Sequence, residues 1–323
     1  MNSFALWYEK KSENANCCED SKLSIHVNLW NRMAKHNMKN YCFDFGFLIG
    51  DITNIKKIFL FVPFKIKIDN ITDLGRIILN HCNLVHAIFN GNYSVLSDEA
   101  KKLLVMEKDS TFIIYALSKI EKQIDVYDYD NGSIIELNLC NIPTMKDKSN
   151  KYYFRFRIEV CNKNVNLIDD QIKGISIFSD QFTNTEIIDF RINDIRSCTD
   201  EIREKFNSGT KFIITEIHYL IIRDADDVII YNGNDISSRV LETNIWCDYI
   251  EGLSHNMVAY HFKKLADNCS NEDVKSIDKF SILARFQYKK NTRLLLIVYI
   301  TVVIILGAIG GVLGDFVSRI IGI

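Results

Sequence analysis

The chain of 323 residues is 47% hydrophobic and 25% charged, a balance that is ordinary for a globular protein and predicts a buried core. Its formal net charge of −2 excludes a general electrostatic attraction to nucleic acid. The nine cysteines include no C-x-x-C pair, so neither a zinc site nor a redox motif is predicted.

The first third of the chain is predicted to form a short helix, two strands and a second helix. We expect the short helix over 23–36 (LSIHVNLWNRMAKH) in the polar N-terminal segment. The segments 41–50 and 56–69 are rich in Phe and Ile and alternate in part between apolar and polar residues, which indicates strands. Apolar residues at helical spacing then predict a helix over 70–90.

Most of the following chain has the pattern of strands. A hairpin is predicted over 123–139, because Asn131-Gly132 suits a type I′ turn with positive φ at both central residues. The segment 151–160 (KYYFRFRIEV) alternates cleanly between apolar and charged residues. Further strands are expected at 110–119, 175–182, 185–194, 211–224, 227–233, 257–264 and 279–290, with short helices at 199–207 and 237–252.

These elements predict an α+β fold: a β-rich cytoplasmic region of sandwich-like sheets with a few short helices, followed by one C-terminal transmembrane helix. The polar segment 145–151 is the best internal boundary. We therefore expect an N-terminal β-rich region at 1–144, a second at 152–290, and the transmembrane helix with a short tail at 291–323. The alternative is one elaborate sandwich in place of two linked domains.

No catalytic signature occurs in the sequence. It contains no dinucleotide-binding, P-loop, zinc-protease or nucleophile-elbow motif, so we predict neither an enzyme nor a cofactor or metal site. The acidic segment 223–227 (RDADD) carries carboxylates of the kind that hold Mg²⁺ beside a phosphate. A solvated turn between two strands explains the same residues, because Asp side chains bond to nearby backbone.

Arg155 and Arg157 are the candidate ligand-binding residues. They adjoin two tyrosines, and a basic surface with aromatic side chains can stack bases and grip phosphates. A strand with arginines on its solvent face has the same pattern. His218 and His261 lie in strand-like segments, and nothing in the sequence pairs them with a nucleophile.

The C-terminal segment is apolar enough to enter a bilayer. Residues 294–313 (LLLIVYITVVIILGAIGGVL) contain no charge, and this length of helix crosses about 30 Å of hydrocarbon. Basic residues precede the segment, so the positive-inside rule predicts a single-pass protein of the inner membrane whose N-terminal region is cytoplasmic. These residues, which also attract anionic lipid head groups, are Arg285, Lys289, Lys290 and Arg293.

Small residues recur along this predicted helix at intervals of four. One row is formed by Gly310, Gly314, Ser318 and Gly322, and a neighbouring row begins with Gly307 and Gly311. Such rows let helix backbones approach closely. A helix that faces only lipid gains nothing from glycine and loses up to about 1 kcal/mol per residue relative to alanine. We therefore expect the chain to associate with itself, as a tetramer or larger.

Asp315 and Arg319 continue the second row and are four residues apart. If the helix stays embedded to Ile323, these charges face protein or water, and a ring of helices lines a polar pore with them. If the helix ends near Gly314, they lie at the outer interface of the membrane. One span per subunit cannot enclose a channel, so conduction requires a homo-oligomer.

This layout of a soluble region, a basic juxtamembrane segment and a minimal membrane part resembles the membrane effectors of bacterial anti-phage defence. Among these are ion-channel-like effectors of nucleotide-signalling systems, such as that of Hailong. The resemblance rests on residues 285–323 and on the absence of catalytic motifs over 1–284, without a diagnostic motif. It implies abortive infection, in which the effector permeabilises the membrane of its own cell in response to a nucleotide or oligonucleotide signal.

The leading hypothesis is therefore a homo-oligomeric membrane effector whose β-rich region gates a glycine-packed helical pore. The first alternative is a tail-anchored scaffold or adaptor that tethers a partner to the membrane. The second alternative is a membrane-bound enzyme that uses the RDADD segment or a site formed only in three dimensions.

Overall fold

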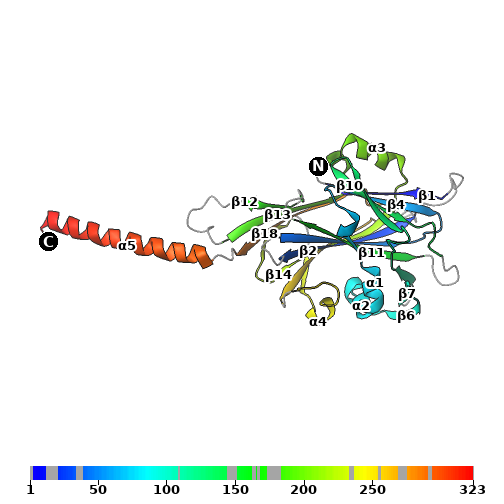
Figure 1. Cartoon of the computed structure of the whole chain (residues 1–323), viewed down its shortest axis with the longest axis horizontal. Coiled ribbons are helices and arrows are strands. Elements are labelled where there is room, and N and C mark those ends of the chain that lie inside the picture. Colours follow the sequence, from blue (N-terminus) through cyan, green and yellow to red (C-terminus); the bar gives the residue numbers. More distant parts are fainter. Residues whose placement is uncertain are drawn as a thin grey trace.

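A computed structural model shows a strand-rich body from which one long helix, α5 (Arg293–Ile321), projects at the C-terminus (Figure 1). The predicted β-rich α+β fold with one C-terminal apolar helix is confirmed. The structure describes residues 3–11, 21–33, 39–107, 110–143, 151–161, 165, 168–172, 183–232, 236–253, 256–267, 275–289 and 293–322.

A ten-stranded mixed sheet forms the centre of the body, with the order β16-β17-β14-β2-β3-β11-β8-β7-β6 and with β5 paired to β11. Most neighbours are antiparallel, but β14 is parallel to β2 and β11 is parallel to β8. The strands are β2 (Lys22–Met33), β3 (Lys39–Ile49), β5 (Ile71–Asp73), β6 (Ser94–Glu99), β7 (Lys102–Glu107), β8 (Ser110–Tyr115), β11 (Tyr152–Cys161), β14 (Ile213–Asp224), β16 (Ser237–Val240) and β17 (Met257–Leu265).

Two four-stranded sheets pack against one face of this central sheet, and all three contribute to one core. Strand β18 leads into α5, and in the second small sheet it is hydrogen-bonded by β13 on one side and β15 on the other. The first small sheet consists of β1 (Ala5–Lys10), β4 (Ile55–Val62), β10 (Gly132–Asn138) and β9 (Ile124–Tyr129). The second consists of β12 (Ile168–Ile172), β13 (Thr183–Ile192), β18 (Phe280–Lys289) and β15 (Val228–Asn232).

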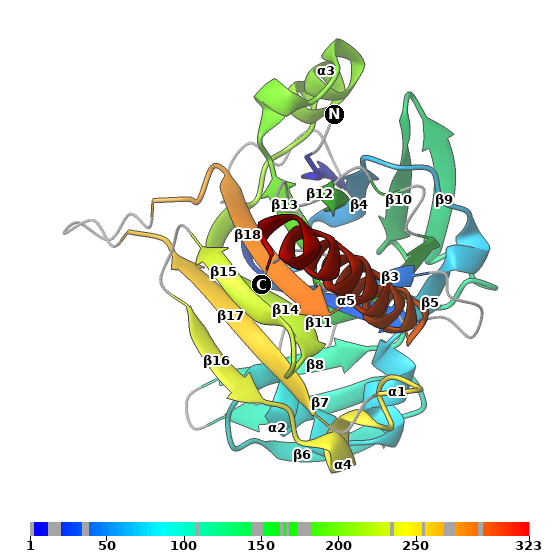
Figure 2. The ribbon, with the colours of Figure 1, turned by 90° about the vertical axis from the view of Figure 1, so that its left-hand side faces the viewer.

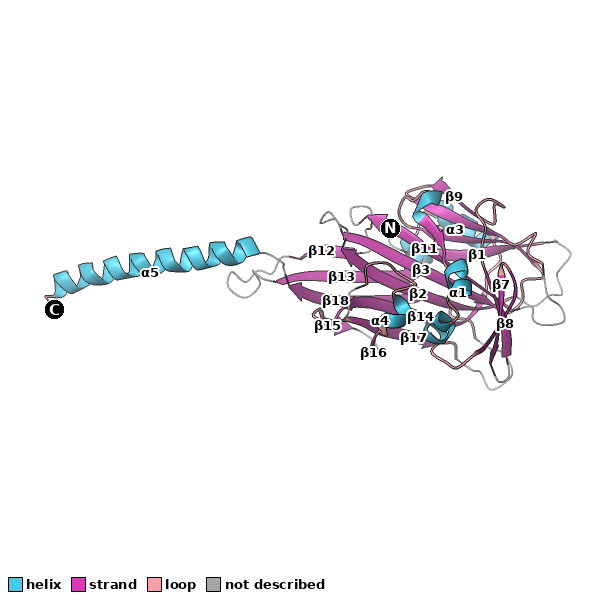
Figure 3. Ribbon diagram, turned by 60° about the horizontal axis from the view of Figure 1, so that its bottom comes forward, coloured by secondary structure: helices cyan, strands magenta, loops and turns pink. Residues whose placement is uncertain are grey.

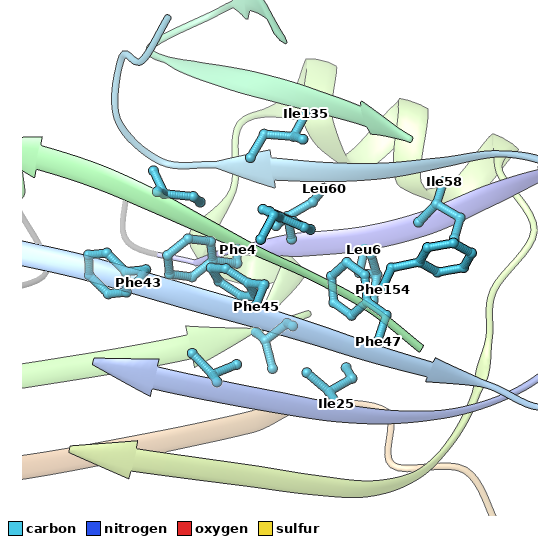
Figure 4. Close-up of a cluster of buried hydrophobic side chains, with 14 of the residues drawn as sticks. Phe4, Leu6, Ile25, Phe43, Phe45, Phe47, Ile58, Leu60, Ile135 and Phe154 are labelled. Carbon is cyan, nitrogen blue, oxygen red and sulfur yellow. The ribbon is translucent and has the colours of Figure 1, made fainter. Parts of the chain in front are cut away.

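Aromatic residues at alternate positions of β3 build this core (Figure 4). Phe43, Phe45 and Phe47 are at most 1% exposed, because side chains of period two all face the small sheets. The ring of Phe4 lies 5.1 Å from that of Phe45. Fully burying a side chain of this size contributes about 1.5–3 kcal/mol. The core therefore fixes which face of β3 packs against the small sheets and which face points the other way.

Short helices cover the other face of the central sheet (Figure 2). These are α1 (Gly75–Asn80), α2 (Asn83–Phe89) and α4 (Thr243–Trp246), which bury a second apolar cluster against the sheet. A fourth helix, α3 (Asp200–Ser208), packs on the outside of the first small sheet. Both faces of the central sheet are thus covered over its middle strands, so polar residues such as Asp44 and Arg155 lie in buried surroundings.

The predicted helix over 23–36 is wrong, because Lys22–Met33 is strand β2. Leu23, Ile25, Val27 and Leu29 are each at most 1% exposed and belong to the core. Their spacing of two is the period of a strand with one buried face. The intervening positions hold Ser24, His26 and Asn28 but then the buried Trp30, so the alternation breaks off within the segment.

The predicted hairpin over 123–139 is confirmed, with its turn shifted by one residue. Gly132 pairs with Tyr129, so Asp130 and Asn131 are the two central residues of the turn. Asp130 has a φ of 49°, and this left-handed conformation is one that aspartate tolerates better than most residues. The predicted strand 175–182 lies outside the described residues.

Strands from both predicted β-rich regions lie side by side in the central sheet. β2 and β3, from 1–144, lie between β14 and β11, from 152–290. The main core also draws on both regions. The segment 145–151 therefore connects parts of one shared sheet and core.

Candidate functional site

A cavity of about 870 Å³ lies over the helix-covered face of the central sheet. Side chains from β2, β14, β17 and β11 line its floor, and α2, α4 and β16 contribute to its walls. Cavities of this size suit small-molecule ligands. The polar residues on the floor therefore form the candidate site of the soluble body.

A row of directly paired residues crosses five strands of this floor. Lys263 on β17 pairs with His218 on β14, which pairs with His26 on β2. His26 in turn pairs with Gly46 on β3, and Gly46 pairs with Arg155 on β11. Because paired residues in a sheet project from the same face, four polar side chains meet on one surface. The glycine in the middle leaves room for the hydroxyl of Tyr153, which a Cβ at this position would overlap.

Arg155 is 1% exposed, and its guanidinium is held by neutral groups. Its Nε donates to the Tyr249 hydroxyl and its Nη1 to the Tyr153 hydroxyl, both at 2.6 Å. The Asn28 amide, turned so that its oxygen faces the guanidinium, accepts from Nη2 at 2.8 Å. Among the described residues no carboxylate lies within ion-pair distance of Arg155. The cavity floor therefore carries a buried positive charge without a direct counter-ion.

Asp44 neutralises the second arginine of the strand. It accepts from Nε and Nη2 of Arg157 at 2.6 and 3.0 Å, a bidentate pair. It also accepts from Trp30 Nε1 at 2.7 Å and from the Tyr249 hydroxyl at 2.8 Å. Asp44 is 0% exposed and Arg157 is 5% exposed. Its four described hydrogen bonds saturate this carboxylate, which leaves it committed to Arg157.

The predicted solvent-facing position of Arg155 and Arg157 is wrong. Both lie on the face of β11 that α4 and its flanking residue Tyr249 cover, so neither guanidinium forms an open basic-aromatic surface. Their roles also differ. Arg157 forms an ion pair with Asp44, whereas Arg155 lines the cavity.

Three histidines converge at the other end of the row. The Nδ1 atom of His218 lies 3.0 Å from Nε2 of His261, and its Nε2 lies 3.0 Å from a carboxylate oxygen of Glu216. The ring of His26 meets that of His218 edge to face, with 4.9 Å between centroids. The described residues contain no cluster of three or more ligands with the geometry of a metal site. The arrangement serves instead as a set of hydrogen-bonding groups.

Two of these histidines, His26 and His261, are held in the neutral state. Burial lowers the pKa of His26 well below 6.5, and the charges of His218, Arg155, His261 and Lys263 lower it further. Burial, followed by the charges of His218, Lys263 and Arg239, lowers the pKa of His261 to about 4. Tyr153 accepts a hydrogen bond from Arg155, so its own proton is available to the Nδ1 atom of His26, 3.4 Å away. The proton of the neutral His26 ring is then on Nε2.

We expect replacement of His261 by glutamine to flatten the pH dependence of stability between pH 4 and 6.5. In this range the unfolded chain, with a histidine pKa near 6.5, binds more protons than the folded protein, so stability falls as the pH falls. Because His261 is partly exposed, solvent screening reduces its contribution to about 1–2 kcal/mol. Thermal unfolding of the full chain in detergent at several pH values measures the slope of stability against pH. An unchanged slope in the variant would contradict this assignment.

The RDADD segment forms the predicted turn, between β14 and β15, but its arginine is not solvated. Arg223 is 2% exposed and forms ion pairs with Glu186 and with Asp227, the latter at 2.8 Å. The described residues place no metal-binding cluster at this turn. The structure thus gives Arg223 a structural role in joining β14 to β13.

The C-terminal helix projects away from the body (Figure 3). Ile297–Val317 is long and apolar enough to cross a membrane, with a mean hydropathy of 2.5, and all its side chains are exposed. Twenty-one helical residues span about 32 Å, which matches the hydrocarbon core of a bilayer. The helix does not end near Gly314, because α5 continues through Asp315 to Ile321.

Among the described residues, nothing lies against the first four glycines of the α5 rows. A Cβ added at Gly307, Gly310, Gly311 or Gly314 would meet no atom within 4 Å. Gly322 follows the helix with a φ of 76°. Of the predicted juxtamembrane cations, Arg285 is an exposed residue of β18, whereas Lys290 lies outside the described residues. The side chains of Lys289, Arg293, Ser318 and Arg319 are likewise outside the described part of the structure.

Sequence reasoning missed the histidine row because it treated His26 as part of a helix and His218 and His261 as isolated. The available signal was alternation. His26 lies opposite the apolar set of β2, His218 lies between the buried residues Ile217 and Tyr219 of β14, and His261 precedes the buried Phe262 of β17. Only the pairing of these three strands, distant in sequence, brings the rings together.

Comparison with known proteins shows little similarity. No protein-family model matches the sequence, and no curated protein matches it. Among solved structures, the chain is similar to the Fcho1 Mu homology domain of Danio rerio with bound Eps15 peptide, at 8% sequence identity. The match covers 83% of this chain and 79% of that chain, with a TM-score of 0.17, which carries no argument about fold or function.

Proposed function

We propose that the chain is a membrane effector: α5 anchors it in the inner membrane and associates with α5 of other copies, while the β-rich body lies in the cytoplasm as a sensor. The observation that carries this proposal is the exposed apolar helix Ile297–Val317 with its unoccupied glycine rows. Exposure of such a large contiguous apolar surface to water is unfavourable, so in this proposal lipid and neighbouring helices cover it. In the proposed assembly, a tetramer or larger ring forms an ion-channel-like pore.

The short connection between body and helix suits such an effector. β18 ends at Lys289 and α5 begins at Arg293, and β18 is held by two neighbouring strands. Only three residues of sequence separate the two elements, so we expect a change in the body that moves β18 to move the start of α5 as well. The signal that we propose is a nucleotide or oligonucleotide, and the response is permeabilisation of the membrane during anti-phage defence.

We expect the full chain to depolarise bacteria in which it is expressed and in which the proposed signal is produced. A membrane-potential dye reports the depolarisation. A chain that ends at Lys290 should be inactive. The matched control replaces 294–323 by an unrelated single-span anchor of equal length, which restores attachment but not the glycine rows. If that chimaera depolarised cells as well as the native chain, the tail would be an anchor only, and the scaffold hypothesis would be preferred.

A further inference from the structure

Arg155 lines the cavity with hydrogen-bonding capacity that the protein does not use. A guanidinium has five N–H donors, and the described partners of Arg155, which are two tyrosine hydroxyls and the Asn28 amide, accept from three of them. Among the described residues nothing accepts from the other two. Because a side chain that is 1% exposed has little access to water, these donors carry a large penalty unless a ligand or solvent molecule in the cavity accepts from them.

The indole of Trp246, beside the same cavity, also lacks a hydrogen-bond partner. Trp246 is 2% exposed and lines the cavity from α4, and its Nε1 has no partner among the described residues. This nitrogen is itself buried, so a ligand in the cavity reaches it only if the indole moves.

The charge of the cavity wall is positive. Four cations line it, Lys151, Arg155, Arg239 and Lys263, against the carboxylates of Glu107 and Glu216, so the net formal charge of the Lys, Arg and Glu side chains is +2. Arg239 is held over the cavity by hydrogen bonds to Asn90 Oδ1 at 2.6 Å and to the Ala87 carbonyl at 3.2 Å. A single carboxylate would compensate only half of this charge. A phosphate group, which carries −1.5 to −2 at neutral pH, compensates nearly all of it.

Aromatic rings also form part of the cavity wall. Phe89 lies 4.9 Å from Phe112 and 5.8 Å from Tyr93, measured between ring centroids, and all three line the cavity. Such a wall favours a flat, apolar moiety over a bare inorganic ion, because a planar ring stacks on aromatic side chains.

We propose that this cavity is a binding site for a small phosphorylated molecule with a planar ring, whose phosphate lies beside His261 with Arg239 and Lys263, while Arg155, at the other end of the row, donates to acceptors on the rest of the molecule. His26 and His261 act as hydrogen-bonding groups in the cavity, with the Nε2 proton of His26 as a donor. This inference deepens the proposed function, on which it rests for its consequence, by placing the signal in the body. Binding at this site is nevertheless independent of what α5 does in the membrane.

The test uses the full chain in detergent micelles, with thermal unfolding measured in the presence of AMP, inorganic phosphate or adenosine. AMP and inorganic phosphate are expected to raise the midpoint, AMP at lower concentration, whereas adenosine alone should raise it little. The pocket variant is Arg239→Gln with Lys263→Gln, two cations at the cavity wall whose loss leaves the buried core intact. We expect it to need about tenfold more AMP or phosphate for the same shift, since charge-assisted hydrogen bonds are lost.

The matched control is Arg196→Gln with Lys264→Gln, which removes the same charge outside the cavity. Lys264 neighbours Lys263 on β17 but is not part of the cavity lining, and Arg196 is 81% exposed. The control should respond to AMP as the unmodified chain does. An equal response in the pocket variant, equal stabilisation by adenosine, or no response of the unmodified chain would each overturn the assignment. None of these readouts involves the membrane, so such a failure would leave the proposed function of α5 standing.

Discussion

Replacement of Asp44 by alanine is expected to destabilise the protein by about 3–5 kcal/mol, because it leaves a buried guanidinium without its counter-ion. Arg157 would lose two hydrogen bonds, and the donors of Trp30 and Tyr249 would each lose one. The variant would also hold two uncompensated arginines side by side on β11. Chemical or thermal unfolding of the full chain in detergent, followed by tryptophan fluorescence, measures the loss.

Two controls separate the buried charge from general effects of the substitution. Asp128→Ala removes a carboxylate that is 70% exposed and lies 3.7 Å from Lys65, and it should change stability by less than about 1 kcal/mol. The double variant Asp44→Ala with Arg157→Met removes both charges and should recover part of the loss, because the guanidinium that lost its partner is gone as well. A loss below about 1 kcal/mol for Asp44→Ala, or no recovery in the double variant, would show that the ion pair does not hold β11 and β3 together.

The strands and the C-terminal helix could be predicted because their signals are local. β11 and β14 alternate or run apolar over nine or more residues, and the segment 294–313 is uncharged for longer than a core helix usually is. The error at 23–36 arose where the alternate positions of β2 hold His26, Asn28 and Trp30. Their mixed character hid the buried apolar set that the structure shows.

The cavity could not be predicted because strand alternation reports two faces without saying what covers the second. Asp44, Arg155 and Arg157 alternate with apolar residues as they would on a solvent-exposed strand. What places them inside is the packing of α2 and α4, and of Tyr249, from segments up to about 200 residues away in sequence, over the same face. Burying a charged side chain in this way is costly unless the charge is paired and hydrogen-bonded. Asp44 meets this requirement for Arg157, and Arg155 remains as the cation that faces the cavity.

Replacement of Gly310 and Gly314 together by leucine is expected to weaken self-association of the full chain in bilayers by about tenfold or more. Each leucine adds four carbon atoms to the row where we propose that neighbouring backbones meet, which forces the helices apart. The helix itself should persist, because leucine has a higher helix propensity than glycine by up to about 1 kcal/mol. Energy transfer between labelled copies in lipid vesicles, or cross-linking in the membrane, measures the oligomer.

Val312→Leu is the matched control, because it enlarges a side chain that is 71% exposed and lies on the other side of the helix from Gly310 and Gly314. It adds bulk on the side away from the row of Gly310 and Gly314, so association through that row should be unchanged. Equal disruption by Val312→Leu would mean that the helices do not pack through the glycine rows. Unchanged association in the double glycine variant would remove the physical basis of a pore and leave α5 as a simple anchor.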